Sequence, residues 1–155
     1  MADIKNKRDI NAYVALCDAL DERNWTYEKV EDELLVHFTL NGDDLPMQFL
    51  IFIDSDRQLV RLLSPMTSEM SEEKRMDGAI AVCHASYVLS EGSFDYDLSN
   101  GRITYRMTYA FLDNEVNTEV ILYLVDFAGA VVDRYNDKFL ALNKGYITLE
   151  KFLEE

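Results

Sequence analysis

Hydrophobic and polar positions alternate in two neighbouring stretches of the chain, residues 34–40 and 47–53. A period of two is typical of a β-strand with one buried face. If the loop runs from Asn41 to Pro46, the facing pairs are Leu40 with Met47, Phe38 with Phe49 and Val36 with Ile51. All six residues then share one face, as a correct register requires. The pattern predicts an antiparallel pair of strands.

A third strand is predicted after the turn Asp54–Arg57, whose short polar residues favour a reversal of the chain. The pairs that this turn predicts are Ile51 with Val60 and Phe49 with Leu62. They extend the same apolar face. We therefore expect a block of strands between Thr26 and Pro65.

The dipeptide Asn100-Gly101 predicts a second hairpin, because it suits a type I′ turn in which both central residues have positive φ. The apolar pairs expected around it are Leu98 with Ile103, Tyr96 with Tyr105 and Phe94 with Met107. On the opposite face, Asp95 is expected to lie across from Arg106. Such opposite charges stabilise a strand pair by roughly a few tenths of a kcal/mol.

Other segments carry apolar residues at helical spacing. The predicted helices run from about Asp9 to Asn24, Ser68 to Leu89 and Asn117 to Asn136, with a short one from Thr148 to Leu153. The residues expected to face the core are Ile10, Tyr13, Val14, Cys17 and Leu20 in the first; Met70, Ala79, Ile80, Cys83, Tyr87 and Val88 in the second; and Val120, Ile121, Leu124, Val125, Ala128, Val131, Val132 and Tyr135 in the third.

The order of these elements is α-βββ-α-ββ-α, which predicts an α+β fold. Strands joined by short turns pair antiparallel, so the expected sheet is antiparallel. The 155 residues fit one domain, residues 1–155. Helices at both ends and in the middle of the chain are expected to cover one face of the sheet.

The second face of the predicted sheet is unusually apolar. The residues expected to point away from the core are Leu35, Leu50, Phe52, Leu59 and Leu63. In the predicted register Phe52 opposes Leu59, and Leu50 opposes Arg61. The solvated face of a two-layer sheet is ordinarily polar. Either a helix of the same chain covers this face, or a second subunit or a partner segment does.

Three arginines, Arg61, Arg102 and Arg106, are expected near this face. One hypothesis is that they bind acidic groups of a partner. The alternative is that they pair with acids of their own chain, such as Asp95.

The net charge of −14 changes the range of expected partners. Nucleic acids and anionic membranes bind proteins through clusters of Lys and Arg, so neither is an expected partner. A basic protein segment would be attracted. The alternative is that the charge only keeps the protein soluble.

The two cysteines, Cys17 and Cys83, lie in apolar helical patterns and are expected to be buried, reduced thiols. The stretch Met1–Lys5 lacks the apolar region of a signal peptide. No apolar run approaches the about 20 residues of a membrane span. The expected location is the cytoplasm.

No catalytic, metal or cofactor site is expected. The two histidines, His37 and His84, fall on different predicted elements, which does not suit a metal site. The chain has no nucleophile motif of the type G-x-S-x-G, no P-loop and no G-x-G-x-x-G. Acidic pairs such as Asp43 and Asp44 fit a solvated surface. These absences favour a protein that is not an enzyme.

Two short stretches, Gly92–Asp97 and Gly101–Arg106, resemble the YbjN family of bacterial proteins, which are proposed regulators of sensory transduction. In that family a strand of the type F-x-x-D precedes a turn ending in G-x-I-x-Y-R, and the final helix follows. The alternating block Met47–Leu63 is also similar. The resemblance implies the fold of type III secretion chaperones, which are acidic homodimers that hold an unfolded stretch of a secreted protein.

The leading hypothesis is a protein-binding module, chaperone-, adaptor- or regulator-like, that acts as a homodimer. A partner could add a strand to a free sheet edge, or two copies could pair through the apolar sheet face or the second helix. One alternative is a small-molecule sensor or an enzyme with an unfamiliar pocket. Another is a structural subunit of a larger assembly.

Overall fold

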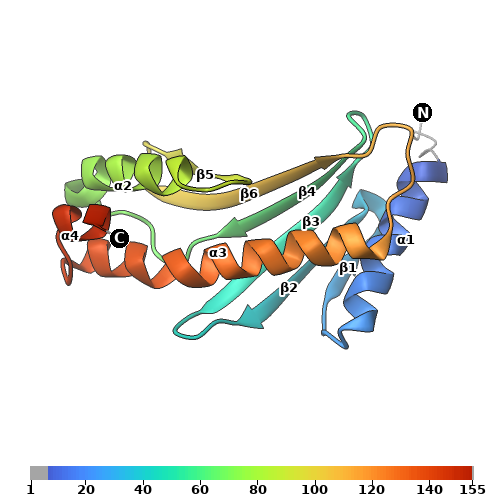
Figure 1. The fold of residues 1–155 in the computed structure, drawn as a ribbon, viewed down its shortest axis with the longest axis horizontal. Coiled ribbons are helices and arrows are strands. Elements are labelled where there is room, and N and C mark those ends of the chain that lie inside the picture. Colours follow the sequence, from blue (N-terminus) through green and yellow to red (C-terminus); the bar gives the residue numbers. More distant parts are fainter. Residues whose placement is uncertain (1–6, 155) are drawn as a thin grey trace.

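The computed structural model describes residues 7–154, so the stretch Met1–Lys5 lies outside the described residues. Six antiparallel strands form one sheet in the order β1-β2-β3-β4-β6-β5. The elements are α1 (Lys7–Glu22), β1 (Glu28–Val30), β2 (Leu35–Asn41), β3 (Pro46–Asp54), β4 (Leu59–Pro65), α2 (Arg75–Tyr87), β5 (Ser93–Asp97), β6 (Arg102–Ala110), α3 (Thr118–Lys144) and α4 (Leu149–Glu154). Figure 1 shows this arrangement. The predicted α+β fold and its order of elements are confirmed, with β1 as an additional short strand.

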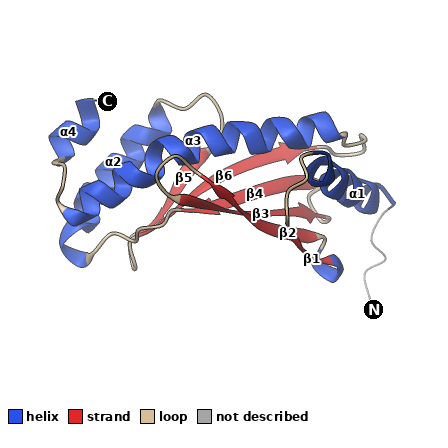
Figure 2. Ribbon diagram, turned by 90° about the horizontal axis from the view of Figure 1, so that it is seen from below, coloured by secondary structure: helices blue, strands red, loops and turns tan. Residues whose placement is uncertain are grey.

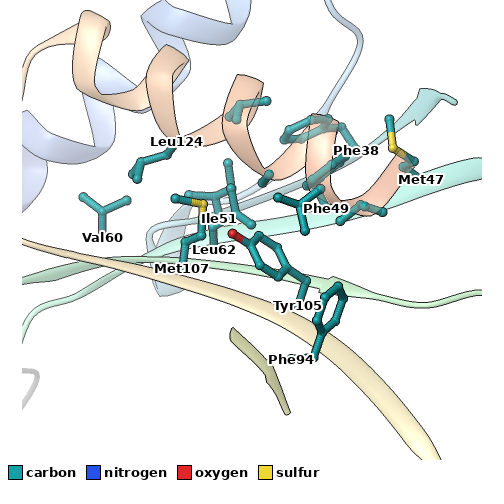
Figure 3. Close-up of a cluster of buried hydrophobic side chains, with 14 of the residues drawn as sticks. Phe38, Met47, Phe49, Ile51, Val60, Leu62, Phe94, Tyr105, Met107 and Leu124 are labelled. Atoms are coloured by element: carbon teal, nitrogen blue, oxygen red, sulfur yellow. The ribbon is translucent and has the colours of Figure 1, made fainter. Parts of the chain in front are cut away.

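All the α-helices lie on one side of the sheet (Figure 2). Helices α1 and α3 pack together, and α2 lies beside β5. The core fills the space between this helical layer and the sheet, and Figure 3 shows Phe49, Ile51, Leu62 and Tyr105 in it. The alternation read from the sequence therefore assigned the buried face of the strands correctly.

The register of β2 against β3 is as predicted, with Val36 opposite Ile51. The predicted register of β3 against β4 is wrong by two residues, because Ile51 lies opposite Leu62. The turn has the expected four residues but lies one residue further along the chain, at 55–58: Asp54 pairs with Leu59, and Gln58 takes φ 56°. A shift of two keeps every side chain on its face.

The β5–β6 hairpin also differs by two residues from the prediction. Phe94 lies opposite Tyr105, and Leu98 is exposed in the loop. Only Gly101 of the predicted dipeptide has positive φ, at 78°, so the turn is not of type I′. The longer loop is held by Asp97, whose backbone oxygen accepts the Gly101 N–H at 2.7 Å and whose carboxylate accepts the Ser99 hydroxyl at 2.6 Å.

Helix α3 begins where the sequence indicated but ends later than predicted. The side chain of Asn117 accepts the Val120 N–H at 2.9 Å and caps the helix. The helix continues past Asn136 to Lys144 and stops before Gly145. The expected end at Asn136 is wrong, because this polar residue is buried in the helix rather than marking its boundary.

Two predicted helical faces need correction. In α1, Ile10 and Val14 are exposed, and the core side is formed by smaller residues together with Tyr13, Leu16 and Leu20. In α2 the error is larger, because Ile80, Cys83, Tyr87 and Val88 are all exposed. The buried residues of α2 are Gly78, Ala81, Val82 and Ala85.

The small residues of α2 let the helix approach β5 closely. The Tyr96 hydroxyl, for example, donates to the Arg75 backbone oxygen at 2.7 Å. Cys17 and Cys83 are both free thiols, but only Cys17 is buried, so the expected burial of Cys83 is wrong. The predicted helix from Ser68 is also too long, since α2 itself begins at Arg75 after a short 3-10 turn, Glu72–Lys74.

Within residues 7–154, no helix is long and apolar enough to cross a membrane.

Candidate functional site on the outer face of the sheet

The face of the sheet that points away from the helices, here called the outer face, carries five partly exposed apolar residues. We call this set the outer patch; its members are Leu35, Leu50, Phe52, Leu59 and Leu63. They come from β2, β3 and β4, and the register places Leu35 beside Phe52 and Leu50 beside Leu63. The outer patch is therefore continuous across three strands.

The corrected register changes the neighbours of Phe52. Arg61, and not Leu59, lies directly opposite it, and Leu59 lies opposite Asp54. The Arg61 guanidinium carbon is 5.7 Å from the centroid of the Phe52 ring, close enough for a cation–π contact. Arg61 also forms a 3.6 Å ion pair with Asp54. These contacts hold Arg61 flat against the outer patch.

The other two arginines are paired with acids of the chain itself. Arg106 lies beside Leu63 and donates to both carboxylate oxygens of Asp95, at 2.8 and 3.1 Å. These hydrogen bonds raise the pKa of Arg106. Arg102 donates to Glu69 at 3.2 Å. The predicted pair of Asp95 and Arg106 is thus present, reached diagonally across the strands.

A shallow depression of about 790 Å³ adjoins the outer patch. Leu50 and Leu63 line it from the outer patch, and Arg102 and Glu69 border it. The remaining residues that line it are His37, Phe38, Thr39, Gln48, Phe49, Pro65, Met66, Thr67 and Thr104. This mixture of apolar and polar side chains on an open surface is typical of a protein contact site.

No cluster of three or more His, Cys, Asp or Glu residues suited to a metal is found in the part of the chain that the structure describes. Burial raises the pKa of the Cys17 thiol, which keeps it in the protonated, weakly nucleophilic form. The outer face itself carries partly exposed apolar side chains and arginines that are paired with acids of the chain.

A second exposed apolar surface lies on α2, the helix that the sequence analysis named as a possible pairing surface although it assigned its apolar residues to the core. We call it the α2 stripe; it consists of Met76, Ile80, Cys83 and Tyr87, with Ala79 and Leu153 beside it. Tyr87 is 87% exposed and Met76 69%. The helical spacing was read correctly, but these apolar residues were assigned to the core. The residues on the other side of α2 are mostly Gly and Ala, which carry little hydrophobic signal.

Comparison with known proteins identifies the fold. No protein-family model and no curated protein matches this chain. The crystal structure of YbjN from E. coli, a proposed transcription regulator, matches with a TM-score of 0.59 at 11% sequence identity, covering 83% of this chain and 89% of YbjN. A chain of the HopA1–SchA chaperone–effector complex matches with a TM-score of 0.48 at 11% identity, covering 94% and 97% of the two chains.

The likeness to YbjN agrees with the resemblance found in the sequence. At 11% identity it shows a shared fold, so the function has to be argued from the surfaces of this chain.

Proposed function

We propose that this protein is a non-enzymatic protein-binding module, chaperone-, adaptor- or regulator-like, whose main contact surface is the outer patch with Arg61, Arg102 and Arg106. One observation carries the proposal: the helices lie on one face of the sheet, while the other face keeps five apolar side chains partly exposed. Apolar patches of this kind usually mark contact sites.

The energy available at the outer patch suits a specific but reversible contact. Full burial of a Leu or Phe side chain contributes about 1.5–3 kcal/mol. Covering the exposed parts of five such side chains therefore yields on the order of 5 kcal/mol, before the cost of association. Arg61 adds a rigid cationic group next to Phe52, and arginine is enriched among residues that dominate binding.

The charge of the chain favours a partner with basic segments. The net charge is −14, and the acids Asp54, Glu69 and Asp95 border the outer face beside their arginines. A basic segment would be attracted from a distance, and its affinity would fall with added salt. The bacterial cytoplasm, where Cys17 and Cys83 stay reduced, is the location we propose.

The test is to replace Phe52 by Asp. The new carboxylate would lie opposite Arg61, so the fold is expected to persist while the outer patch loses its central ring. Proteins that copurify with the native chain from its own cells should be depleted with F52D. The matched control is Tyr146→Asp, since Tyr146 is 79% exposed in the α3–α4 loop. Equal copurification with F52D and the unchanged chain would refute the outer patch as the site.

We also propose that two copies pair through the α2 stripe. Its large residues recur every three or four positions along one helix, as in a helix–helix seam. A single helical stripe is self-complementary around a two-fold axis, so it suits an isologous dimer.

Ile80→Asp tests the dimer, with Val14→Asp as its control. The two side chains are matched, being 46% and 48% exposed on different helices. Light scattering should give twice the monomer mass for the native chain and for V14D, and the monomer mass for I80D. A native chain that is monomeric at high concentration would contradict the proposed dimer.

A structural subunit of a larger assembly is the second candidate function. The observation that favours it is the presence of two separate apolar surfaces, the outer patch and the α2 stripe. It predicts that F52D and I80D each remove a different neighbour from the same large particle.

A further inference from the structure

Strand β6 has a free edge along its last residues. On one side, β4 pairs with β6 as far as Ala110. On the other side, β5 is shorter and pairs only with Arg102–Arg106. The segment Met107–Ala110, here called the β6 edge, therefore has a neighbouring strand on one side alone.

The backbone groups that point outward from the β6 edge follow from the alternation of the ladder. The Phe94 N–H donates to the Ser86 hydroxyl at 2.9 Å, so the backbone N–H of Phe94 points away from β6. In an antiparallel ladder, the backbone N–H and C=O groups of successive residues point to opposite edges of the strand. Tyr105, opposite Phe94, therefore directs its backbone groups toward β4, and Thr108 and Ala110 direct theirs toward the free edge. Both residues are exposed, and neither backbone N–H has a hydrogen-bond partner within residues 7–154.

A groove of about 570 Å³ runs along the β6 edge. Its apolar wall comes from α3, through Val120, Tyr123 and Leu124. Glu91 and Glu119 lie at its border. The groove thus combines unpaired backbone groups, an apolar wall and negative charge.

The local structure explains why the chain does not fill this groove itself. By the register of the hairpin, Glu91 would be the residue to pair with Thr108. Its backbone oxygen instead accepts the Tyr105 hydroxyl at 2.9 Å, and its carboxylate accepts the Tyr123 hydroxyl at 2.8 Å. Tyr105 from β6 and Tyr123 from α3 hold Glu91 away from the edge, and β5 begins only at Ser93.

We propose that the β6 edge binds an extended, basic segment of a partner protein by strand addition. Backbone groups of the segment would pair with Thr108 and Ala110, and one apolar side chain would lie against Val120 and Leu124. A Lys or Arg of the segment would meet Glu91 and Glu119. The inference rests on the proposed function for the nature of the ligand, a protein, but it uses a different surface.

The charge around the groove favours such a segment over a second copy of the chain. Two copies paired edge to edge would bring Glu91 and Glu119 of both molecules together, in a protein of net charge −14. Like charges brought together in this way oppose association, whereas a cationic side chain would be attracted. Extended peptides bind free sheet edges in this way in many proteins.

The probe for the test is a soluble peptide of about ten residues that alternates Lys and Val, long enough to span a strand. Backbone amide spectra of the full chain should show shifts and slower hydrogen exchange at Thr108 and Ala110 when the peptide is added. A peptide that alternates Glu and Val should not bind. Shifts confined to the outer patch or the α2 stripe, or equal binding of the acidic peptide, would overturn the proposal.

Ala110→Pro tests the hydrogen bond itself. Proline lacks the N–H but is tolerated on the open side of an edge strand. Loss of one hydrogen bond should weaken the Lys–Val peptide about fivefold. Ala110→Val, which keeps the N–H, should bind as the native chain does. Equal affinity of A110P and A110V would refute strand addition.

Four further measurements test the binding of a segment at the β6 edge. If A110P does not fold, a Lys–Val peptide methylated on alternate backbone nitrogens replaces it and should bind weakly; full binding of that peptide would refute the proposal. Glu91→Gln should weaken binding and reduce its dependence on salt. F52D should leave binding unchanged, so failure of the outer patch and failure of the β6 edge are separate outcomes.

Shifts of the Thr108 and Ala110 amides on dilution of the protein alone would instead identify a second copy as the occupant.

Discussion

Asn136 is a buried polar residue that joins three parts of the chain. It lies on α3 and is 2% exposed. Its side-chain oxygen accepts the Thr67 N–H at 2.8 Å, and its side-chain nitrogen donates to the Thr67 hydroxyl at 3.0 Å and to the Pro46 oxygen at 3.4 Å. It thereby fixes the segment after β4 and the start of β3 against α3.

Asn136→Leu should lower the free energy of unfolding by about 2–3 kcal/mol, because the Thr67 N–H and the Pro46 oxygen lose their partner at a buried position of α3. Urea denaturation followed by circular dichroism measures this. The control is Asn143→Leu on the same helix, which loses bonds to Ser71 and Ser68 at a more exposed position and should cost about 1 kcal/mol. Equal losses in the two variants would contradict the assigned role.

Tyr13 gives a dependence of stability on pH. Burial, followed by the nearby Cys17, raises its pKa from the ordinary value of 10.0 to about 12. The folded chain therefore holds this proton more tightly than the unfolded chain does. The resulting stability is fully present below pH 10 and is lost as the pH rises toward 12.

The free energy of unfolding should accordingly fall between pH 10 and 12, and Tyr13→Phe should reduce that fall. The fall should not vanish, because burial also raises the pKa values of Tyr27 and Tyr105. Urea titrations at closely spaced pH values make the comparison. A Y13F variant with the same alkaline slope as the native chain would refute the assignment.

These residue-level features could not be read from the sequence. Asn136 is a poor helix former that the sequence alone places at a helix end, since only the packed structure shows that its amide is fully bonded. Cys83 and Ile80 were expected in the core because their spacing is helical. Spacing identifies an apolar face of a helix, but it does not show that this face is the buried one when the opposite face consists mostly of Gly and Ala, as in α2.

Two hairpins of the sheet, β3–β4 and β5–β6, show what determines register. In both, alternation assigned side chains to the correct face, while the pairing was displaced by two residues. The displacement arises in the turns: Gln58 has positive φ, and Asp97 closes a four-residue loop through Ser99 and Gly101. A period of two cannot detect a shift of two, so only the hydrogen bonds of the turn decide the register.

Gly101→Ala tests how strongly that loop depends on its contact with the chain before α2. The φ of 78° disfavours any side chain, and a Cβ here would collide with the Met70 backbone oxygen. Gly145 has nearly the same φ, 76°, but a Cβ there would meet nothing within 4 Å. Gly145→Ala should therefore cost about 1 kcal/mol of stability, and Gly101→Ala clearly more. Equal thermal destabilisation of the two variants would contradict the packing of the hairpin on Met70.

Residues 7–154 form a two-layer structure in which the α-helices lie on one side of the sheet (Figure 2). This arrangement leaves the outer patch open and makes its burial by another protein favourable. The residues of the outer patch were identified from alternation alone, because their parity in β2, β3 and β4 opposes that of the core. The second helix and a free sheet edge were named as possible contact surfaces, but the residues of the α2 stripe and the β6 edge could not be predicted. The α2 stripe depends on the orientation of the helix, and the β6 edge depends on unequal strand lengths.

The central claim is that a protein partner covers the outer patch, and site-specific photo-crosslinking in the native cells tests it most directly. A photoreactive phenylalanine analogue placed at Phe52 should form a covalent adduct with another protein on illumination. The same analogue at Tyr146, which is 79% exposed on the helical side, should form none. An adduct at position 146 with none at position 52 would contradict the account.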